Sequence, residues 1–191
     1  KKIPSDWVAK GAEYQPHWAY VPPESHQIPK SDDDQWCFHW IDSFIKARLD
    51  KKGISPTTDA DPITLVRRLT FDLTGLPPTP AEIDAYLSND ASDRYEQLVE
   101  KLLVSPRHAE RLASWWLDLV RYADTVGYHG DQDYSVWPYR DYVINAFNQN
   151  MSFDQFTREQ LAGDLLAGSN RDQKVASGYN RLHMITAEGG A

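Results

Sequence analysis

The feature that most constrains this chain is a repeated helix-start signal, in which a capping residue stands directly before a proline. Asp61-Pro62, Thr79-Pro80 and Ser105-Pro106 each suit a helix whose N-cap side chain accepts a backbone hydrogen bond and whose first position is proline. Gly53 and Gly75 stand where a left-handed residue ends a helix. These signals divide the chain into short helices with tight joints.

Between these signals, apolar residues recur at intervals of three and four. The clearest set is Tyr95, Leu98, Val99, Leu102 and Leu103, which mark one face of a helix. Helices are expected from the acidic residues 32–34 to about 49, then over 62–74, 80–87, 94–103, 105–124, 137–149, 152–167 and 171–182. No segment alternates apolar and polar residues as a strand would. The sequence therefore predicts an all-α fold, an irregular array of about seven or eight short helices rather than a symmetric bundle.

Residues 1–30 are expected to form an extended segment outside this array. The segment is punctuated by Gly11, Pro16, Pro22, Pro23 and Pro29, and its aromatic groups are Trp7, Tyr14, Trp18 and Tyr20. Such a strip suits an extended, linker-like chain that packs on the body of its own protein, or a linker from an upstream domain; the two are compatible. Residues 31–191 are then expected to form a single helical domain.

Charge and cysteine content exclude several classes of protein. The 191 residues carry a formal net charge of −8, which argues against nucleic acid and anionic membranes as partners. Cys37 is the single cysteine, so the chain has no internal disulfide, no four-cysteine zinc site and no C-x-x-C-H haem attachment. No apolar run approaches a membrane span, and the first residues lack the apolar core of a signal peptide.

The helix expected over 105–124 has two faces. Leu112, Trp116, Leu119, Val120 and Ala123 are predicted to face a core. A second, polar stripe holds Arg111, Ser114, Asp118, Arg121 and Thr125, in which Asp118 can pair with Arg121 and receive the hydroxyl of Tyr122. This stripe is either an exposed ion-pair face or, as Trp115 between the two faces suggests, a partly covered one.

The loop that follows, 125–138, is long for a compact domain and rich in aromatic and acidic residues. His129, Asp131 and Asp133 alternate, so an extended backbone would point all three the same way. With Asp124 they offer ligands for a divalent metal, although the spacing matches neither an EF-hand nor an H-E-x-x-H pattern. The alternative is a hydrogen-bonded acidic loop tied to Arg140 or Arg121.

Later segments contribute further candidates to the same polar zone. Gly163 is expected to permit close approach of another element. His183 suits a structural hydrogen bond or, like the adjacent Met184, a single axial haem ligand. His183 and Met184 cannot both coordinate one iron from opposite sides, because they are neighbours on one element. Carboxylate pairs such as Asp131 with Asp133, or Asp164 with Glu188, could serve in acid–base work. The candidate catalytic residues are Asp118, Arg121, Asp124, Arg140, Asp164 and Glu188, and the candidate binding residues are Tyr122, Tyr128, Trp137, Gln160 and His183.

Several long strings carry a family resemblance. They are Ile41–Ile45 (IDSFI), Leu65–Thr79 (LVRRLTFDLTGLPPT), Leu117–Thr125 (LDLVRYADT), Tyr139–Ile144 (YRDYVI) and Glu159–Leu166 (EQLAGDLL). In these strings the chain resembles the planctomycete cytochrome-associated domain of unknown function, from about Trp36 to Ala191. Residues 7–23 resemble the segment that joins that domain to a cytochrome c-like module.

The resemblance implies an extracytoplasmic protein, periplasmic or secreted, with haem elsewhere in a longer polypeptide. It also implies as partners the cytochrome c-like module and a C-terminal partner domain, and an association with polysaccharide degradation. Similar proteins continue into a Cys-x-x-Cys-His motif past the Glu188-Gly189-Gly190 segment, so this chain resembles a fragment. The stretch Cys37–Trp40 departs from the family pattern.

Three functional hypotheses follow. The first is a non-catalytic helical domain that binds a partner module or a glycan through an acidic and aromatic cleft. The second is a redox or hydrolytic carbohydrate-active enzyme with a carboxylate, histidine and arginine pocket, with a divalent metal as its candidate cofactor. The third is a purely structural role, in which the polar motifs cap helices and pair charges inside the fold.

Overall fold

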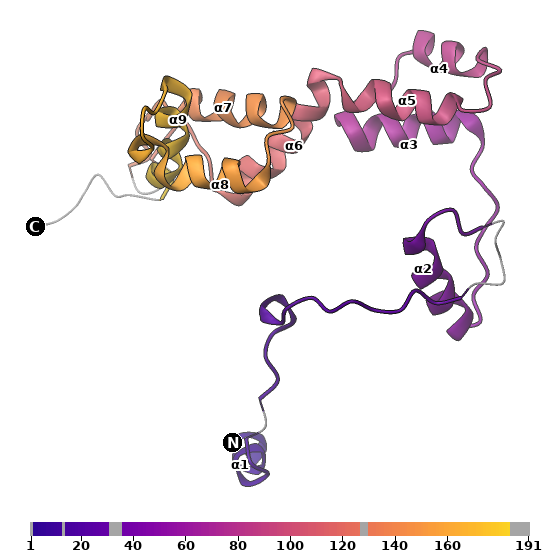
Figure 1. Ribbon diagram of the computed structural model, residues 1–191, viewed down its shortest axis with the longest axis horizontal. Coiled ribbons are helices and arrows are strands. Elements are labelled where there is room, and N and C mark those ends of the chain that lie inside the picture. The colour runs from indigo at the N-terminus through magenta and orange to yellow at the C-terminus, as the bar shows by residue number, and fades with distance from the viewer. Residues whose placement is uncertain (1, 13, 31–35, 127–129, 184–191) are drawn as a thin grey trace, which may run out of the picture. The chain divides into compact units, whose positions relative to one another are not determined.

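The computed structural model describes residues 2–12, 14–30, 36–126 and 130–183. The chain divides into two compact units, Lys1–Asp59 and Ala60–Ala191. The described parts contain nine α-helices and three short 3₁₀ helices, with Thr125 and Asp133 forming an isolated antiparallel bridge (Figure 1). The prediction of an all-α fold is confirmed.

The first unit contains α1 (Lys2–Ala9), η1 (Trp18–Tyr20) and α2 (Trp40–Lys51). Helix α1 lies in the stretch predicted to be extended, so that prediction is wrong for residues 2–9. No described residue of this unit is buried, and Trp18, Tyr20 and Phe38 are each at least four-fifths exposed. The unit therefore has no core among its described residues. Packing of residues 1–30 on the body stays a prediction, and α2, expected with the helical domain, falls in this first unit.

Helix α2 begins later than the acidic residues 32–34 suggest. Its N-cap is His39, whose side chain accepts from the backbone N–H of Ile41, while the Asp42 carboxylate accepts from the backbone N–H of His39. Its end follows the prediction: Gly53 has φ of 64°, and the Ile54 N–H donates to the Leu49 carbonyl at 3.0 Å.

The second unit contains the remaining helices. They are α3 (Pro62–Thr74), α4 (Pro80–Leu87), α5 (Arg94–Leu103), α6 (Pro106–Leu119), α7 (Trp137–Asn148), α8 (Phe153–Ala162), η2 (Gly163–Leu165), α9 (Arg171–Ala176) and η3 (Ser177–Arg181). Asp61, Thr79 and Ser105 cap α3, α4 and α6 as predicted, each with proline at the first helical position. Helix α6 packs on α3 and on α7, so it connects two groups of helices, α3–α5 and α7–α9 (Figure 1).

The main core lies in the second group. Its buried residues come from α6, α7, α8 and α9, and are Ala113, Tyr139, Tyr142, Val143, Ala146, Phe156 and Ala176. The Tyr142 and Phe156 rings stack at 6.1 Å between centroids, and Trp116 meets Phe156 edge-on at 5.0 Å. Aromatic packing of this kind supplies much of the burial that holds short helices together.

Helices α6 and α8 end sooner than predicted. Helix α6 stops at Leu119 rather than near 124, because Arg121 adopts a left-handed conformation (φ 58°) and the Tyr122 N–H returns to the Leu117 carbonyl. Leu119, the last residue of α6, was predicted to face the core and is 72% exposed. Helix α8 ends at Ala162, where the chain tightens into η2.

Candidate functional site

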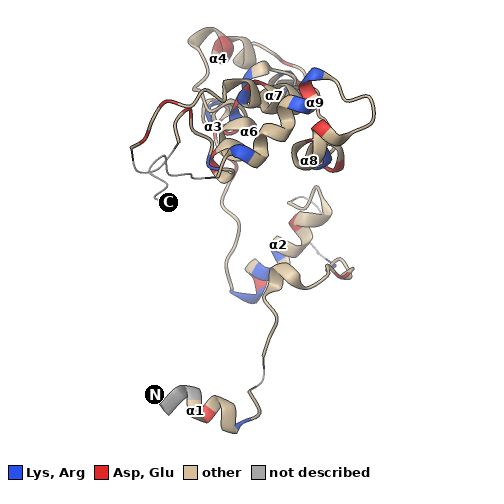
Figure 2. Cartoon of the chain, turned by 90° about the vertical axis from the view of Figure 1, so that its left-hand side faces the viewer, with Lys and Arg blue, Asp and Glu red and all other residues tan. Residues whose placement is uncertain are grey.

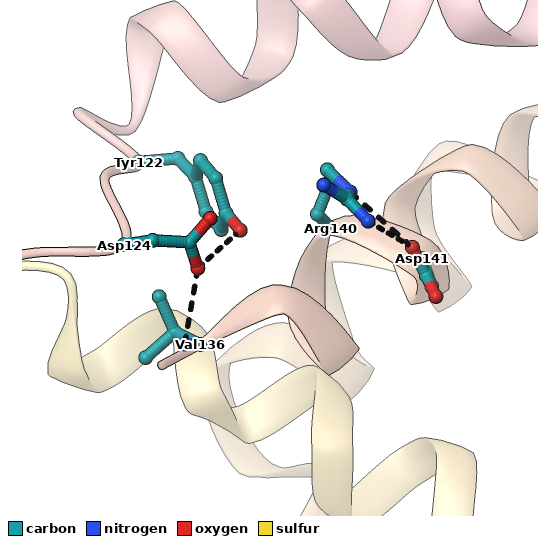
Figure 3. A network of polar contacts seen from close by, with 5 residues as sticks. All are labelled: Tyr122, Asp124, Val136, Arg140 and Asp141. Atoms are coloured by element: carbon teal, nitrogen blue, oxygen red, sulfur yellow. Dashed lines mark hydrogen bonds and ion pairs between the residues drawn. The ribbon is translucent and has the colours of Figure 1, made fainter. Parts of the chain in front are cut away.

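The early end of α6 positions the first part of the candidate site. Because Arg121 turns the chain out of the helix, Tyr122 no longer lies one turn after Asp118. The Tyr122 hydroxyl donates instead to Asp124 Oδ1 at 2.8 Å (Figure 3). The predicted Asp118–Tyr122 contact is therefore wrong. Asp118 and Arg121 are both exposed.

Asp124 ties the start of the loop to its end. Its Oδ1 also accepts from the backbone N–H of Val136 at 3.3 Å, and its carbonyl accepts from the backbone N–H of Tyr134 at 2.8 Å (Figure 3). The bridge between Thr125 and Asp133 lies beside these bonds. Asp124 thus fixes where helix α7 begins relative to the end of α6.

Arg140 and Asp141 form the other half of the site, in the first turns of α7. Arg140 donates from Nε and Nη2 to Asp141 Oδ1 at 3.3 and 3.1 Å. This hydrogen bond is the main reason that the pKa of Arg140 is raised, and the negative charge of Asp124 adds to it. Figure 3 shows the Tyr122–Asp124 pair and the Arg140–Asp141 pair on neighbouring parts of the fold.

The Tyr122 ring is partly buried between these groups. It stacks on Tyr139 with 6.5 Å between centroids. Burial, followed by the hydrogen bond to Asp124 and the charge of that carboxylate, raises the pKa of Tyr122 to about 12, against a smaller opposing effect of Arg140. Tyr122 is therefore a neutral hydrogen-bond donor at physiological pH.

The predicted metal set is only partly described. Asp124, Asp131 and Asp133 are exposed, whereas His129 and the binding candidate Tyr128 lie outside the described residues. Among the residues that the structure does describe, no three His, Cys, Asp or Glu side chains are grouped to hold a metal ion. The predicted metal site stays a prediction.

Gln160 belongs to the interior. It is 2% exposed, and its Oε1 accepts from Trp116 Nε1 at 3.0 Å and from the Tyr139 hydroxyl, while its Nε2 donates to the Phe156 carbonyl at 3.1 Å. Burial raises the pKa of Tyr139 to about 12, against the opposing hydrogen bond from Trp116. All these groups satisfy one another inside the core, so the contacts of Gln160 are structural.

Glu159, next to Gln160, is a buried residue that the sequence pattern did not single out. It is 4% exposed, and three neutral groups donate to its carboxylate: Tyr142 Oη at 3.0 Å, Gln155 Nε2 at 3.1 Å and Gln173 Nε2 at 3.0 Å. Burial pushes its pKa upward, but the bonds from Gln173, Gln155 and Tyr142 together outweigh burial and hold the pKa below its usual range. Conversely, burial and the Glu159 carboxylate raise the pKa of Tyr142.

Of the remaining candidates, Arg121 and His183 line one pocket, together with Trp116 and Asn180. Asp164 is exposed within η2, and His183 is exposed with Nδ1 3.3 Å from the Asn180 carbonyl. Trp137 is 50% exposed at the start of α7. Glu188 and Met184 lie outside the described residues. The structure thus joins Tyr122 with Asp124, and Arg140 with Asp141. Tyr139 lies between Tyr122, on which it stacks, and Gln160, to which its hydroxyl donates.

The polar stripe on α6 is partly covered where the stripe begins, at Arg111, as one of the two interpretations of the sequence predicted. The Arg111 guanidinium lies over the Trp115 ring at 4.8 Å from the centroid, and over Phe71 of α3 at 6.0 Å. Arg111 therefore covers the contact between α6 and α3 rather than lining the site at the other end of α6.

Comparison with known proteins places the chain in a family. Residues 40–191 match the family described as PSCyt2, a protein of unknown function (DUF1549). The chain belongs to this family. No curated protein and no solved structure matches it. Within the described part of this PSCyt2 chain, no helix is both long enough and apolar enough to cross a membrane.

Proposed function

We propose that the helical unit is a non-catalytic module of an exported protein, which binds a glycan through one surface at the start of α7. This surface, here called the α7 surface, consists of Tyr122, Asp124, Trp137, Arg140 and Asp141. The observation that carries the proposal is the half-exposed Trp137 at the first position of α7, the end of the helix at which the Tyr122–Asp124 and Arg140–Asp141 pairs lie.

The geometry of α7 supports this reading. Arg140 and Asp141 follow Trp137 by three and four residues, so the three side chains share one face of the helix. Val136, just before Trp137, donates its N–H to Asp124, which brings the Tyr122–Asp124 pair to the same end of α7. An apolar ring beside hydrogen-bonding groups suits a sugar, which presents C–H faces and hydroxyl groups.

Preorganisation also supports a binding role. Each polar pair of the surface is already bonded within the protein, so its side chains lose little conformational freedom when a ligand arrives. The described carboxylates with displaced pKa values, Asp61, Glu82, Asp154 and Glu159, are all displaced downward. These four are permanent anions near neutral pH, whereas a general acid requires a raised pKa.

The wider setting of the proposal comes from the sequence resemblance. It places the module outside the cytoplasm, in a longer polypeptide with a cytochrome c-like module and a C-terminal partner domain, in the context of polysaccharide degradation. Charged residues of both signs are distributed along the helices (Figure 2), so binding at the α7 surface depends on its own groups rather than on a uniform field.

A binding screen against immobilised polysaccharides, with the isolated cytochrome c-like module as a second target, tests the proposal. Trp137→Ala is expected to weaken glycan binding at least tenfold. Trp115→Ala is the matched control, because Trp115 is exposed to a similar degree (56%) but lies on α6 over Arg111, away from the α7 surface.

Three results would reject the proposal. In the first, the protein binds the cytochrome c-like module but no polysaccharide. The second is equal loss in the two tryptophan variants. The third is turnover of a polysaccharide that disappears in Asp124→Asn, which would favour an enzyme. Thermal melts of both variants establish that they are folded.

A further inference from the structure

A small pocket lies at the opposite end of α7 from Trp137. It has a volume of about 200 Å³ and is formed by the last turns of α7, the first turns of α8 and the start of α9. Pockets for drug-sized ligands occupy about 300–1,000 Å³, so this one fits a single small molecule rather than a polymer chain.

Side-chain amides dominate the lining. Five amide residues line the pocket. They are Asn145 of α7, Gln149 that caps the end of α7, Gln155 of α8, Asn170 that caps the start of α9, and Gln173 of α9. An amide side chain carries both a hydrogen-bond donor and an acceptor. The side-chain oxygens of Asn170 and Gln173 already accept backbone N–H groups of the α9 capping box. A ligand that uses the remaining donors and acceptors of the amides must itself offer both in close succession, which is the property of adjacent hydroxyl groups.

The wall contains a preorganised centre. The buried Glu159 carboxylate lines the pocket and is bonded by Gln155, Gln173 and Tyr142 at 3.0–3.1 Å. These bonds fix two of the five amides in place, so they orient Gln155 and Gln173 before any ligand binds. Gly163 allows the Gln173 backbone to approach η2 closely, which sets α9 against the end of α8.

The charge of the lining excludes an anionic ligand. Glu159 and Asp172 line the pocket, and the described lining includes no lysine or arginine. An anion would therefore meet two carboxylates without a compensating cation, which costs binding free energy at short range. A neutral molecule with several hydroxyl groups meets no such penalty.

We propose that this pocket, between α7, α8 and α9, is a binding site for one neutral polyhydroxylated molecule of the size of a monosaccharide. The site is separate from the α7 surface, since Asn145 lies roughly 12 Å from Trp137 along the helix axis. It does not depend on the proposed binding of a glycan there.

The test uses the 191-residue chain and saturation-transfer NMR, followed by titration. The probes are glucose, galactose, mannose and myo-inositol, with glucuronate as the anionic and glucosamine as the cationic comparison. At least one neutral probe is expected to bind with a Kd in the millimolar range, and glucuronate at least tenfold more weakly than the corresponding neutral sugar.

Variants locate the binding. Asn145 and Gln149 are both exposed residues of the lining. Asn145→Ala and Gln149→Ala are each expected to weaken binding of the neutral probe at least fivefold. Asn148→Ala is the matched control, an exposed amide of the same helix outside this pocket, and is expected to stay within twofold of the unchanged protein. Trp137→Ala should leave monosaccharide binding intact.

Each contrary result overturns the proposal. These are no binding of any neutral probe, equal or tighter binding of glucuronate, binding of glucosamine alone, and loss of binding in Asn148→Ala to the same extent as in Asn145→Ala. Loss in Trp137→Ala without loss in Asn145→Ala would assign the monosaccharide to the α7 surface instead.

Discussion

Replacing Gly163 with alanine tests the packing of α9 against the end of α8. A Cβ atom built on Gly163 would lie 2.0 Å from the carbonyl oxygen of Gln173 and 2.8 Å from its carbonyl carbon. Both atoms belong to the backbone, so the overlap cannot be relieved by a side-chain rotation. Alanine therefore requires α9 to move away from η2.

Two opposing terms set the expected size of the effect. The backbone of Gly163 is helical (φ −60°, ψ −35°), so without the overlap alanine would stabilise the protein by about 0.5–1 kcal/mol. Overpacking of this kind costs about 1–3 kcal/mol or more, and a moving α9 also weakens the bond from Gln173 to the Glu159 carboxylate, worth about 1.5–3 kcal/mol. We expect a net loss of about 3 kcal/mol in the free energy of unfolding.

Chemical denaturation of Gly163→Ala measures this loss, and a fall of roughly 6–12 °C in Tm accompanies it for a chain of this size. Gly178→Ala is the matched control, because its Cβ would make an ordinary contact of 3.7 Å with Tyr139 Cβ. The control is expected to stay within about 1 kcal/mol of the unchanged protein. A Gly163→Ala protein as stable as the unchanged one would refute the close approach of η2 and α9.

Three further changes probe other parts of the fold. Arg121→Gly should raise the free energy of unfolding by about 0.5–1 kcal/mol, because glycine removes the left-handed strain at φ 58° at a smaller entropic cost; a loss of stability in a urea melt would contradict this. Glu159→Gln should cost about 1–2 kcal/mol at pH 7. The pKa of Glu159 in the folded protein lies below the free value of 4.5, so the stabilisation by the ionised carboxylate is fully present above pH 4.5 and is lost as the pH falls through the folded pKa. Urea melts of Glu159→Gln and of the unchanged protein should therefore converge in acid. A difference in stability that stays constant with pH would contradict this. Thr79→Ala should cost about 1 kcal/mol by removing the cap of α4, and an unchanged melt would show that the Thr79–Glu82 box contributes nothing.

Much of the secondary structure could be predicted because its signals are local. The N-caps Asp61, Thr79 and Ser105 each act within three residues of their own position, and Gly75 ends α3 through its own left-handed backbone. Such features depend on sequence neighbours alone. The close approach at Gly163 could also be anticipated from the missing side chain, although not the identity of its partner.

The end of α6 could not be read in the same way. A left-handed residue is usually glycine or asparagine, but here it is Arg121, and the apolar pattern continues past it to Ala123. The helix was therefore predicted to be about five residues too long, and Tyr122 was assigned to the wrong partner. No local residue preference opposes the longer helix.

Hydrogen bonds and caps within a few residues set the helical class, most helix boundaries and the joints between helices, so these features could be predicted from local sequence. Which polar side chains are buried depends instead on the packing of one helix against another. Glu159 and Gln160 sit on a helix like any exposed polar pair, and they become interior groups because Tyr142, Tyr139 and Gln173 arrive from other helices. A carboxylate can be buried only where donors replace its water, and two of the three donors to Glu159 are brought from other helices by packing rather than by sequence spacing.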